Sequence, residues 1–229
     1  MANILIYAGY IVTVVAHANR TPVEDLVARG AGEASTLDQL GAASSIIHIC
    51  APGSPEVETI VSGLMKSMTN GSVIIDCSTS DPISTLALAG ELKAAGIQLA
   101  EAPLGGTPVQ AEKGELSTMV GADSHVFERI KPVIEAWAQA IVHIGPTGDG
   151  HKMKLLNNFL SLGYAALYSE ALALSEKVGI SSAQFDSVIR GSRMDCGFYQ
   201  TFMECVVGGN RQAHKFTLKN ALKLSLIHI

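Results

Sequence analysis

The pattern of hydrophobic and polar positions changes once along the chain, near residue 145. Before that point, short apolar runs rich in β-branched residues alternate with longer segments of helical character. The apolar runs cover residues 11–16, 45–50, 72–76, 97–100 and 140–144. Continuous runs of this length are typical of strands buried on both faces, and their alternation with helices predicts βαβ units around a parallel sheet.

Helices are expected between these strands, because proline and glycine mark helix boundaries there. Pro22 stands at the start of one predicted helix and Gly30 follows its end, while Gly9 ends the first predicted helix. The predicted helices cover residues 2–8, 23–28, 56–68, 82–95 and 124–137.

Beyond Gly145-Pro146 the strand pattern does not return. Apolar residues recur at helical spacing from His151 to Val178, and further helices are expected from Ser181, Phe198 and Phe216. We therefore predict two domains, a doubly wound α/β domain at 1–145 and an all-helical domain at 146–229.

The front of the predicted sheet lacks a familiar element. A doubly wound nucleotide-binding domain normally starts with a strand and a glycine-rich turn, which place a helix N-terminus beneath a pyrophosphate. Here the chain starts within the helix that should follow that turn, and Gly9 is the only glycine before residue 30. The expected fold is thus a Rossmann-like parallel sheet without its first strand and turn, followed by an incomplete helical domain.

Composition excludes several classes of protein. Hydrophobic residues make up 48% of the 229 residues and charged residues 16%, which excludes intrinsic disorder. The 16 basic residues against 21 acidic ones leave a charge of -5, so no nucleic-acid partner is expected. The apolar segment 1–18 has no preceding Lys or Arg and is interrupted at Gly9-Tyr10, which argues against a secretory signal and a membrane span.

The cysteines and histidines show no metal-binding spacing. The four cysteines form no CxxC pair and the seven histidines no HxxxH pair. We therefore expect no metal ion, reduced thiols and a cytoplasmic location.

Three segments at the ends of predicted strands are candidates for cofactor binding. Asn19-Arg20-Thr21 follows the first strand, where an arginine suits the 2′-phosphate of NADP and an acidic residue the 2′-hydroxyl of NAD. Ala51-Pro52 and Thr79 follow the next two strands, at the edge where open α/β sheets bind ligands. The alternatives are an ordinary surface arginine and helix-capping or turn residues.

The segment 101–108 is a candidate anion site. Gly105 and Gly106 let a ligand approach the backbone, and Thr107 follows them. A plain connecting loop is the alternative.

The start of the long helix carries the candidate for proton transfer. Lys154, Asn157 and Asn158 lie at i, i+3 and i+4, so they project from one helical face. The positive end of the helix dipole disfavours a cation, which should lower the pKa of Lys154 toward a range useful for general acid/base chemistry. The two amides can orient a polar substrate; a solvated lysine between surface asparagines is the alternative.

Taken together, these segments resemble the β-hydroxyacid dehydrogenase family, which includes 3-hydroxyisobutyrate dehydrogenase and tartronate semialdehyde reductase. The resemblance rests on four stretches that follow the family order over nearly the whole chain. They are NRT at 19–21, DCST at 76–79, EAPLGGTPVQAEKGELSTMVG at 101–121 and GDGHKMKLLNN at 148–158.

The resemblance implies a role for each matched position. Lys154 is the general acid/base, Asn158 orients the substrate, and the 105–107 loop contacts the substrate carboxylate. The residues implied to line the dinucleotide are Arg20, Ala51, Pro52 and Thr79, with Lys223 near the cofactor.

The chain departs from the family pattern at several positions. Gly105 replaces a serine that commonly precedes two glycines, and Gly106 stands where the sulfolactaldehyde reductase branch has arginine. The segment between Val14 and Asn19 is longer than usual. Lys223 is not followed by the family's aspartate, and the final residues LSLIHI look foreign, so the resemblance implies truncation at both ends.

From these observations we predict an oxidoreductase that uses NADP, with NAD as the alternative. It would exchange hydride with a small 3-hydroxyacid or its semialdehyde and form a homo-oligomer in its complete form. Two rival hypotheses are a truncated, non-catalytic fragment that pairs with itself and an imine-reductase-like relative. Lys154 argues against the second rival, because imine reductases carry a different proton donor at that position.

Overall fold

The computed structural model describes residues 1–213 and 216–227. Its contacts divide the chain into two compact units, Met1–Lys154 and Leu155–Ile229, each described here by itself. Of the six C-terminal residues singled out in the sequence, His228 and Ile229 lie outside the described residues.

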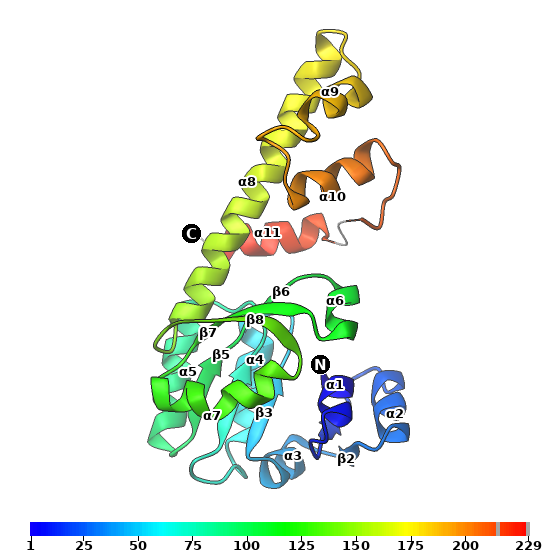
Figure 1. Cartoon of the computed structure of the whole chain (residues 1–229). Helices are drawn as coiled ribbons and strands as arrows, with labels where there is room; N and C mark the ends of the chain where they lie inside the picture. The colour runs from blue at the N-terminus through cyan, green and yellow to red at the C-terminus, as the bar shows by residue number, and fades with distance from the viewer. Residues whose placement is uncertain (214–215, 228–229) are drawn as a thin grey trace. The chain divides into compact units, whose positions relative to one another are not determined.

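The first unit alternates strands and helices and ends in the first turn of a long helix (Figure 1). Its elements are α1 (Ala2–Tyr7), β1 (Thr13–Val15), α2 (Thr21–Ala28), β2 (Gly32–Ala34), α3 (Leu37–Ala43), β3 (Ile46–Ile49), α4 (Ser54–Leu64), β4 (Val73–Asp76), α5 (Pro82–Ala94), β5 (Gln98–Glu101), β6 (Leu104–Gly105), α6 (Pro108–Lys113), β7 (Leu116–Gly121), α7 (Ser124–Glu135), β8 (Ala138–Gly145) and the start of α8 (Asp149–Lys177).

The main sheet has six strands. They follow the order β3-β4-β5-β7-β6, and β8 pairs with β7. The predicted parallel arrangement is confirmed for β3, β4 and β5, whose registers align Ile49 with Asp76 and Asp76 with Glu101. The sheet then becomes mixed, because β7 runs antiparallel to β5 and β6 while β8 runs parallel to β7.

The first two strands of the chain do not pair with the main sheet. The short strands β1 and β2 form a separate two-stranded parallel sheet. Among the described residues, no strand joins β1 to β3. The glycine-rich turn that precedes this point in other dinucleotide folds is not present in the sequence, and α1 instead packs Leu5 into the core beside β4 and α7.

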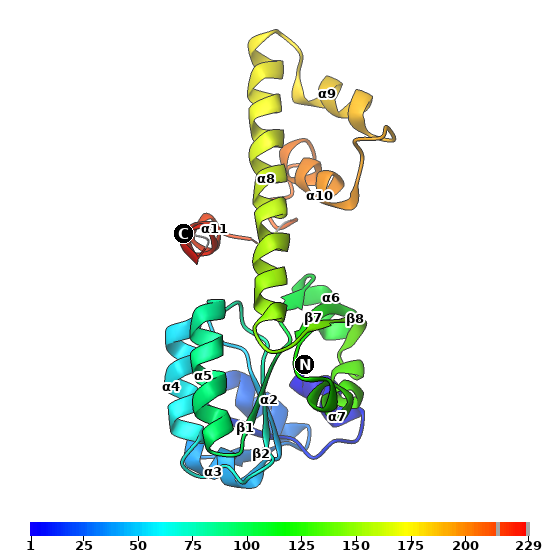
Figure 2. The same cartoon turned by 90° about the vertical axis from the view of Figure 1, so that its left-hand side faces the viewer.

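Two hydrophobic cores hold the sheet between helix layers, with α4 and α5 on one face and α7 on the other (Figure 2). Alternate residues of β4 explain this division, because Ile74 packs toward α4 and α5, whereas Val73 and Ile75 pack toward α7.

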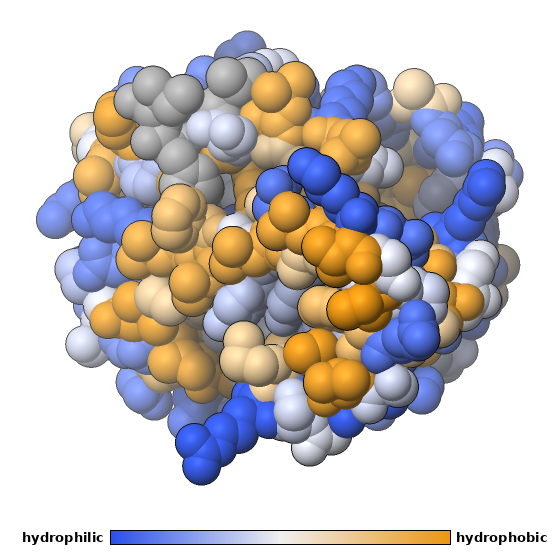
Figure 3. Space-filling view, turned by 90° about the horizontal axis from the view of Figure 1, so that it is seen from above, coloured by the Kyte–Doolittle hydropathy of each residue, from blue (hydrophilic) through white to orange (hydrophobic). Residues whose placement is uncertain are grey.

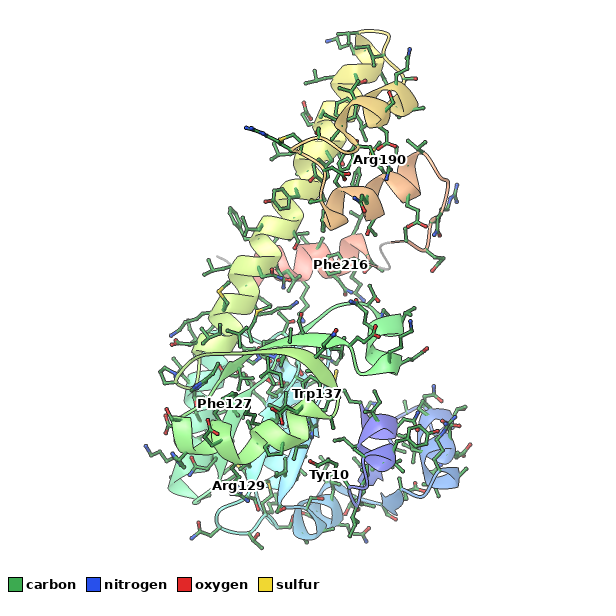
Figure 4. The ribbon with its side chains drawn as sticks, in the orientation of Figure 1. Tyr10, Phe127, Arg129, Trp137, Arg190 and Phe216 are labelled. Atoms are coloured by element: carbon green, nitrogen blue, oxygen red, sulfur yellow. The ribbon has the colours of Figure 1, made fainter. Side chains whose placement is uncertain are left out.

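Trp137 is fully buried and belongs to the same hydrophobic core as Phe127; both are labelled in Figure 4. Its Nε1–H donates to Nε2 of His48 over 3.3 Å, and burial lowers the pKa of His48 to about 4. The sequence placed Trp137 at the end of a helix, but α7 ends at Glu135 and Trp137 precedes β8. The buried Trp137 side chain therefore anchors the short connection between α7 and β8 in the core.

The second unit is helical throughout its described residues. It contains the rest of α8, α9 (Ser182–Ile189), α10 (Gly197–Val206) and α11 (Leu218–Ile227). Leu172 of α8 packs with Tyr199 and Met203 of α10 in a small core. The predicted absence of strands beyond residue 145 holds for the part of this region that the structure describes.

Two further features concern hydrophobic and sulfur-containing residues. Among the described residues, none of the helices combines the length and hydrophobicity needed to cross a bilayer. All four cysteines have free thiols. Cys77 is buried, Cys205 is half-buried, and Cys50 and Cys196 are exposed.

Candidate active site

Two buried carboxyl groups mark the C-terminal ends of the central strands. Asp76 ends β4 and Glu101 ends β5, in register with each other, and they are 2% and 0% exposed. Asp76 accepts hydrogen bonds from the backbone N–H of Ser78 and from the hydroxyl of Ser80, both over 2.8 Å. These contacts fix the turn after β4 at the edge where parallel sheets bind ligands.

Glu101 contacts the beginning of α8. Its Oε1 accepts a hydrogen bond from the backbone N–H of Gly148 over 2.5 Å. Burial raises the pKa of Glu101 to about 8, although backbone donors, including those of Gly148 and His151, act in the opposite direction. The carboxyl group therefore changes charge near neutral pH rather than in acid.

His151 attaches the first turn of α8 to two further elements. The imidazole is fully buried, and its Nδ1 lies 2.8 Å from the hydroxyl oxygen of Thr85 on α5. Its Nε2 lies 3.7 Å from Oδ2 of Asp76. Because α5 and β4 are both contacted through this one side chain, His151 fixes the rotation of α8 about its axis.

Glycines bring α8 and β7 into direct backbone contact. A methyl group on Gly121 would lie 2.5 Å from the backbone nitrogen of Gly150 and 2.7 Å from Oε2 of Glu101. A methyl group on Gly150 would lie 2.7 Å from the carbonyl oxygen of Met119. Real side chains are never this close, so only glycine permits the contact.

Lys154 follows one turn after His151 on the same helix. Its side chain is half-buried, and burial lowers the pKa of its amine from the ordinary value. This is the direction expected from the sequence, but desolvation is the cause rather than the helix dipole. Asn157 and Asn158 continue the same helical face. Asn158 is buried, at 9% exposed, and Asn157 is half-buried.

The residues predicted to bind the adenosine end lie at the start of α2. Arg20 is the N-cap, and its guanidinium pairs with Glu33 over 2.8 Å and Glu24 over 3.8 Å. Oδ1 of Asn19 accepts from the backbone N–H of Thr21 over 3.1 Å. All three predicted residues are exposed, and two carboxylates already neutralise Arg20 in the free chain.

The predicted residues after β3 and β4 are neighbours. The backbone N–H of Ala51 donates to the hydroxyl of Ser78 over 2.9 Å. Pro52 is exposed and Thr79 half-buried beside this contact. The structure thus brings the two strand ends together, as expected for one ligand-binding edge.

The predicted anion loop is built from β6 and the start of α6. Thr107 forms a capping box with Gln110, and Gly106 has a φ of 122°, which favours glycine. A methyl group on Gly105 would lie 2.5 Å from the hydroxyl oxygen of Ser117. The hydroxyl group of Ser117 therefore occupies the space beside residue 105, and a serine cannot be added there without moving it.

Lys223 lies on α11, in the second unit, and is half-buried. Sequence reasoning did not find Glu101, His151, Gly121 and Gly150 as site residues. The signal for the last three was present in the motif GDGH at 148–151 and in Gly121. Among the described residues, no group of three or more potential metal ligands is found.

Comparison with known proteins decides the family. Residues 1–145 match the model of the NAD binding domain of 6-phosphogluconate dehydrogenase. Residues 148–224 match the model of the NAD-binding segment of NADP-dependent 3-hydroxyisobutyrate dehydrogenase. The chain belongs to the β-hydroxyacid dehydrogenase family. Its cofactor is accordingly NAD(P), and the predicted resemblance is confirmed.

Individual relatives are consistent with this family. The chain is 36% identical to 2-(hydroxymethyl)glutarate dehydrogenase of Eubacterium barkeri over 73% of its own length and 56% of the relative. It is 34% identical to 2-hydroxy-3-oxopropionate reductase of Escherichia coli over 74% of its length and 60% of the relative. The chain thus spans less than two thirds of these β-hydroxyacid dehydrogenases.

A solved structure shows the same fold. Mycobacterium tuberculosis 3-hydroxyisobutyrate dehydrogenase, determined with L-serine, superposes with a TM-score of 0.80 at 25% identity. The match covers 86% of this chain and 67% of the other.

The residues present fit one part of an NAD(P) molecule. Arg20 supplies a cation at an exposed helix start, and a dinucleotide phosphate can compete there with Glu33. The helix α4 starts after Gly53 without a side-chain cap, at the edge of the sheet where a helix start can hold a phosphate. No glycine-rich pyrophosphate turn occurs in the 229 residues.

Proposed function

We propose that this chain carries out NAD(P)-dependent exchange of hydride with a small 3-hydroxyacid or its semialdehyde, with Lys154 as the general acid/base. One observation carries the proposal. The half-buried amine of Lys154, with its lowered pKa, lies one turn beyond a helix start that buried groups fix to the cofactor edge of the sheet. A solvated lysine on a mobile helix would have neither property.

Each polar residue then has a distinct role. The bound nicotinamide cofactor supplies or accepts the hydride. Lys154 donates a proton to the oxygen of the reduced substrate and removes it in the oxidation direction. Asn157 and Asn158 orient the substrate, and the backbone N–H groups of the loop at 105–107 hold its carboxylate.

Cofactor binding is assigned to the strand ends. In this proposal Arg20 contacts the 2′-phosphate of NADP, with Asn19 and Thr21 beside it. Ala51, Pro52 and Thr79 line the dinucleotide, and Lys223 is also assigned to cofactor binding. We place the helical domain at 146–229. The free thiols support a reducing, cytoplasmic setting.

Binding of NADPH tests the proposal directly. Titration of NADPH into the full chain, followed by cofactor fluorescence, should show saturable binding, and a panel of small semialdehydes should then oxidise the bound cofactor. The rival hypothesis is a non-catalytic chain. Saturable NADPH binding followed by oxidation of the bound cofactor would exclude that rival. A flat titration, or binding without cofactor oxidation by any semialdehyde, would contradict our proposal.

Replacement of Arg20 should alter cofactor choice. We expect Arg20→Gln to weaken NADPH binding by roughly tenfold to a hundredfold, because a charge-assisted hydrogen bond is lost, and to leave NADH binding nearly unchanged. The measurement is the ratio of the two Kd values. Arg29→Gln is the matched control, since Arg29 caps the other end of the same helix and pairs with Asp25. Equal ratios in both variants would show that Arg20 does not meet the 2′-phosphate.

We further propose that α8 pairs with a second copy of the chain. Leu156, Leu160, Leu167 and Leu174 recur at spacings of four and seven residues on this helix and are 55–66% exposed. Apolar side chains also gather on the face seen in Figure 3. Exposed apolar stripes of this length are typical of association surfaces.

The oligomeric state tests this surface. We expect the wild-type chain to be dimeric or larger in light scattering and Leu160→Glu/Leu167→Glu to be monomeric, because charged groups cannot be buried between helices. Ile83→Glu, at an apolar position on α5 that is 78% exposed, is the control. A wild-type monomer would contradict the proposal.

A further inference from the structure

The start of α8 is held by buried groups to which the proposed reaction assigns no role. Glu101 of β5 accepts a hydrogen bond from Gly148, and His151 contacts Thr85 and lies near Asp76. Glu101 and His151 are both 0% exposed. Fully buried ionisable groups are destabilising unless a specific contact compensates them, so their joint presence under one helix turn requires an explanation.

The geometry around Glu101 is specific to its carboxyl group. Oε1 lies 2.5 Å from the backbone nitrogen of Gly148, immediately before α8. Oε2 is buried against the backbone of Gly121 on β7, at a position where that residue has no side chain. The two oxygens therefore contact α8 and β7 at once, while the main chain of Glu101 pairs with both β4 and β7.

Lys154 depends on this attachment, because a helix transmits the placement of its first turn to the next. Lys154 lies six residues beyond Gly148 and three beyond His151. We propose that Glu101 is a positioning residue for Lys154, its carboxyl group fixing the first turn of α8 against β5 and β7 and so setting where the lysine amine lies. The inference rests on the proposed acid/base role of Lys154.

The surroundings of Glu101 define how pH acts on it. The titratable groups that face it are Asp76 from β4, which raises its pKa, and His151 from α8, whose backbone N–H lowers it. From β7 the backbone of Gly121 lies beside its Oε2. Burial is the largest effect, and the pKa of Glu101 is about 8.

The sign of the pH effect follows from this raised pKa. The folded chain holds the proton up to about pH 8, whereas the unfolded chain releases it near 4.5. The contribution of Glu101 to the free energy of unfolding is therefore fully present below pH 4.5 and is lost as the pH rises to about 8. Glu101→Gln should abolish this dependence, because an amide keeps the acceptor for Gly148 and does not titrate.

Two variants separate positioning from simple stability. Glu101→Gln retains an oxygen acceptor, and Glu101→Leu has similar volume but no acceptor. We expect Glu101→Leu to lower kcat by about tenfold to a hundredfold with the Kd for NADPH unchanged, as for a small displacement of a reacting group. Glu101→Gln should have nearly the wild-type kcat at pH 7. In the wild-type chain kcat should change near pH 8, where Glu101 loses its proton, and in Glu101→Gln this change should be absent. Glu91→Gln, at an exposed position on α5, is the control.

Nuclear magnetic resonance gives a readout that needs no turnover. With ¹³C-labelled glutamate and lysine, the Glu101 carboxyl should titrate near pH 8 in the wild-type chain. The Gly148 amide and the Lys154 side-chain signals should move in Glu101→Leu and stay near their wild-type positions in Glu101→Gln. Titration of Glu101 near its ordinary value, or unchanged Gly148 and Lys154 signals in Glu101→Leu, would overturn the inference.

These signals also separate the two claims. If the chain binds NADPH but turns over no semialdehyde, the proposed function fails, while the Gly148 and Lys154 signals still decide whether Glu101 positions the helix. If turnover occurs and Glu101→Leu matches the wild type in kcat, the positioning role fails and the proposed function stands.

Discussion

Replacement of Lys154 by alanine should reduce turnover by about 10²–10⁴-fold, the usual contribution of a general acid/base. The Kd for NADPH should remain nearly unchanged, because the cofactor residues that we propose lie on other elements. The amine is half-buried with a lowered pKa, so its proton is more easily released than that of an exposed lysine. The measurement is steady-state NADPH oxidation with a small semialdehyde, at several pH values.

Lys152 provides the matched control for this prediction. It lies on the same helical turn, is exposed, and pairs with Asp149 over 2.9 Å. Lys152→Ala should keep wild-type turnover, since an exposed ion pair contributes little. Turnover that persists in Lys154→Ala, or that is lost equally in both variants, would mean that another group delivers the proton.

Replacement of Gly150 by alanine should have the largest effect on stability. The added methyl group would lie 2.7 Å from the carbonyl oxygen of Met119 and 2.8 Å from the backbone nitrogen of Gly121. Because these backbone atoms of β7 cannot turn aside as a side chain can, α8 must move away from β7. We expect the free energy of unfolding to fall by at least about 1–3 kcal/mol. The measurement is urea denaturation of the full chain.

A second glycine distinguishes this clash from a general effect of alanine. Gly90 lies within α5, and a methyl group added there would meet no atom outside its own stretch of helix within 4 Å. Gly90→Ala should therefore stabilise the chain by about 0.5–1 kcal/mol, since alanine favours helices. An unchanged midpoint for Gly150→Ala would contradict the direct contact between α8 and β7.

The sequence was most informative where hydrophobic periodicity acts alone. The apolar runs at 45–50 and 72–76 correspond to β3 and β4, and the pattern after residue 145 correctly indicated helices. Strand β2 has the sequence Gly-Glu-Ala and lacks any apolar run, so its pairing with β1 decides its structure. Strand β7 was hidden because its buried Thr118 interrupts the apolar pattern, a position explained by its hydrogen bond to Pro103.

Local capping chemistry could have revealed one missed helix. Thr107 and Gln110 form a capping box around Pro108, a pattern visible in the sequence, and they start α6. No local pattern of this kind predicts that β7 pairs antiparallel with β5. The direction of β7 depends on the path of the chain through β6 and α6, which connect the two strands.

The candidate site was likewise predictable from the sequence only in part. The motif around Lys154 and the strand-end segments could be read from residue types and order, and the family match supports that reading. The buried contacts beneath the helix could not, because Glu101 and His151 are 50 residues apart in the sequence and meet only through the register of the sheet. A buried carboxyl and an exposed one look alike in a sequence.

The most direct test of the central claim is the titration of the Lys154 amine itself. In the wild-type chain with ¹³C-labelled lysine, assigned through Lys154→Arg, the signal of Lys154 should titrate below the ordinary value of 10.5. The exposed Lys152 serves as the internal reference. A Lys154 signal that titrates at 10.5 or above would contradict the account.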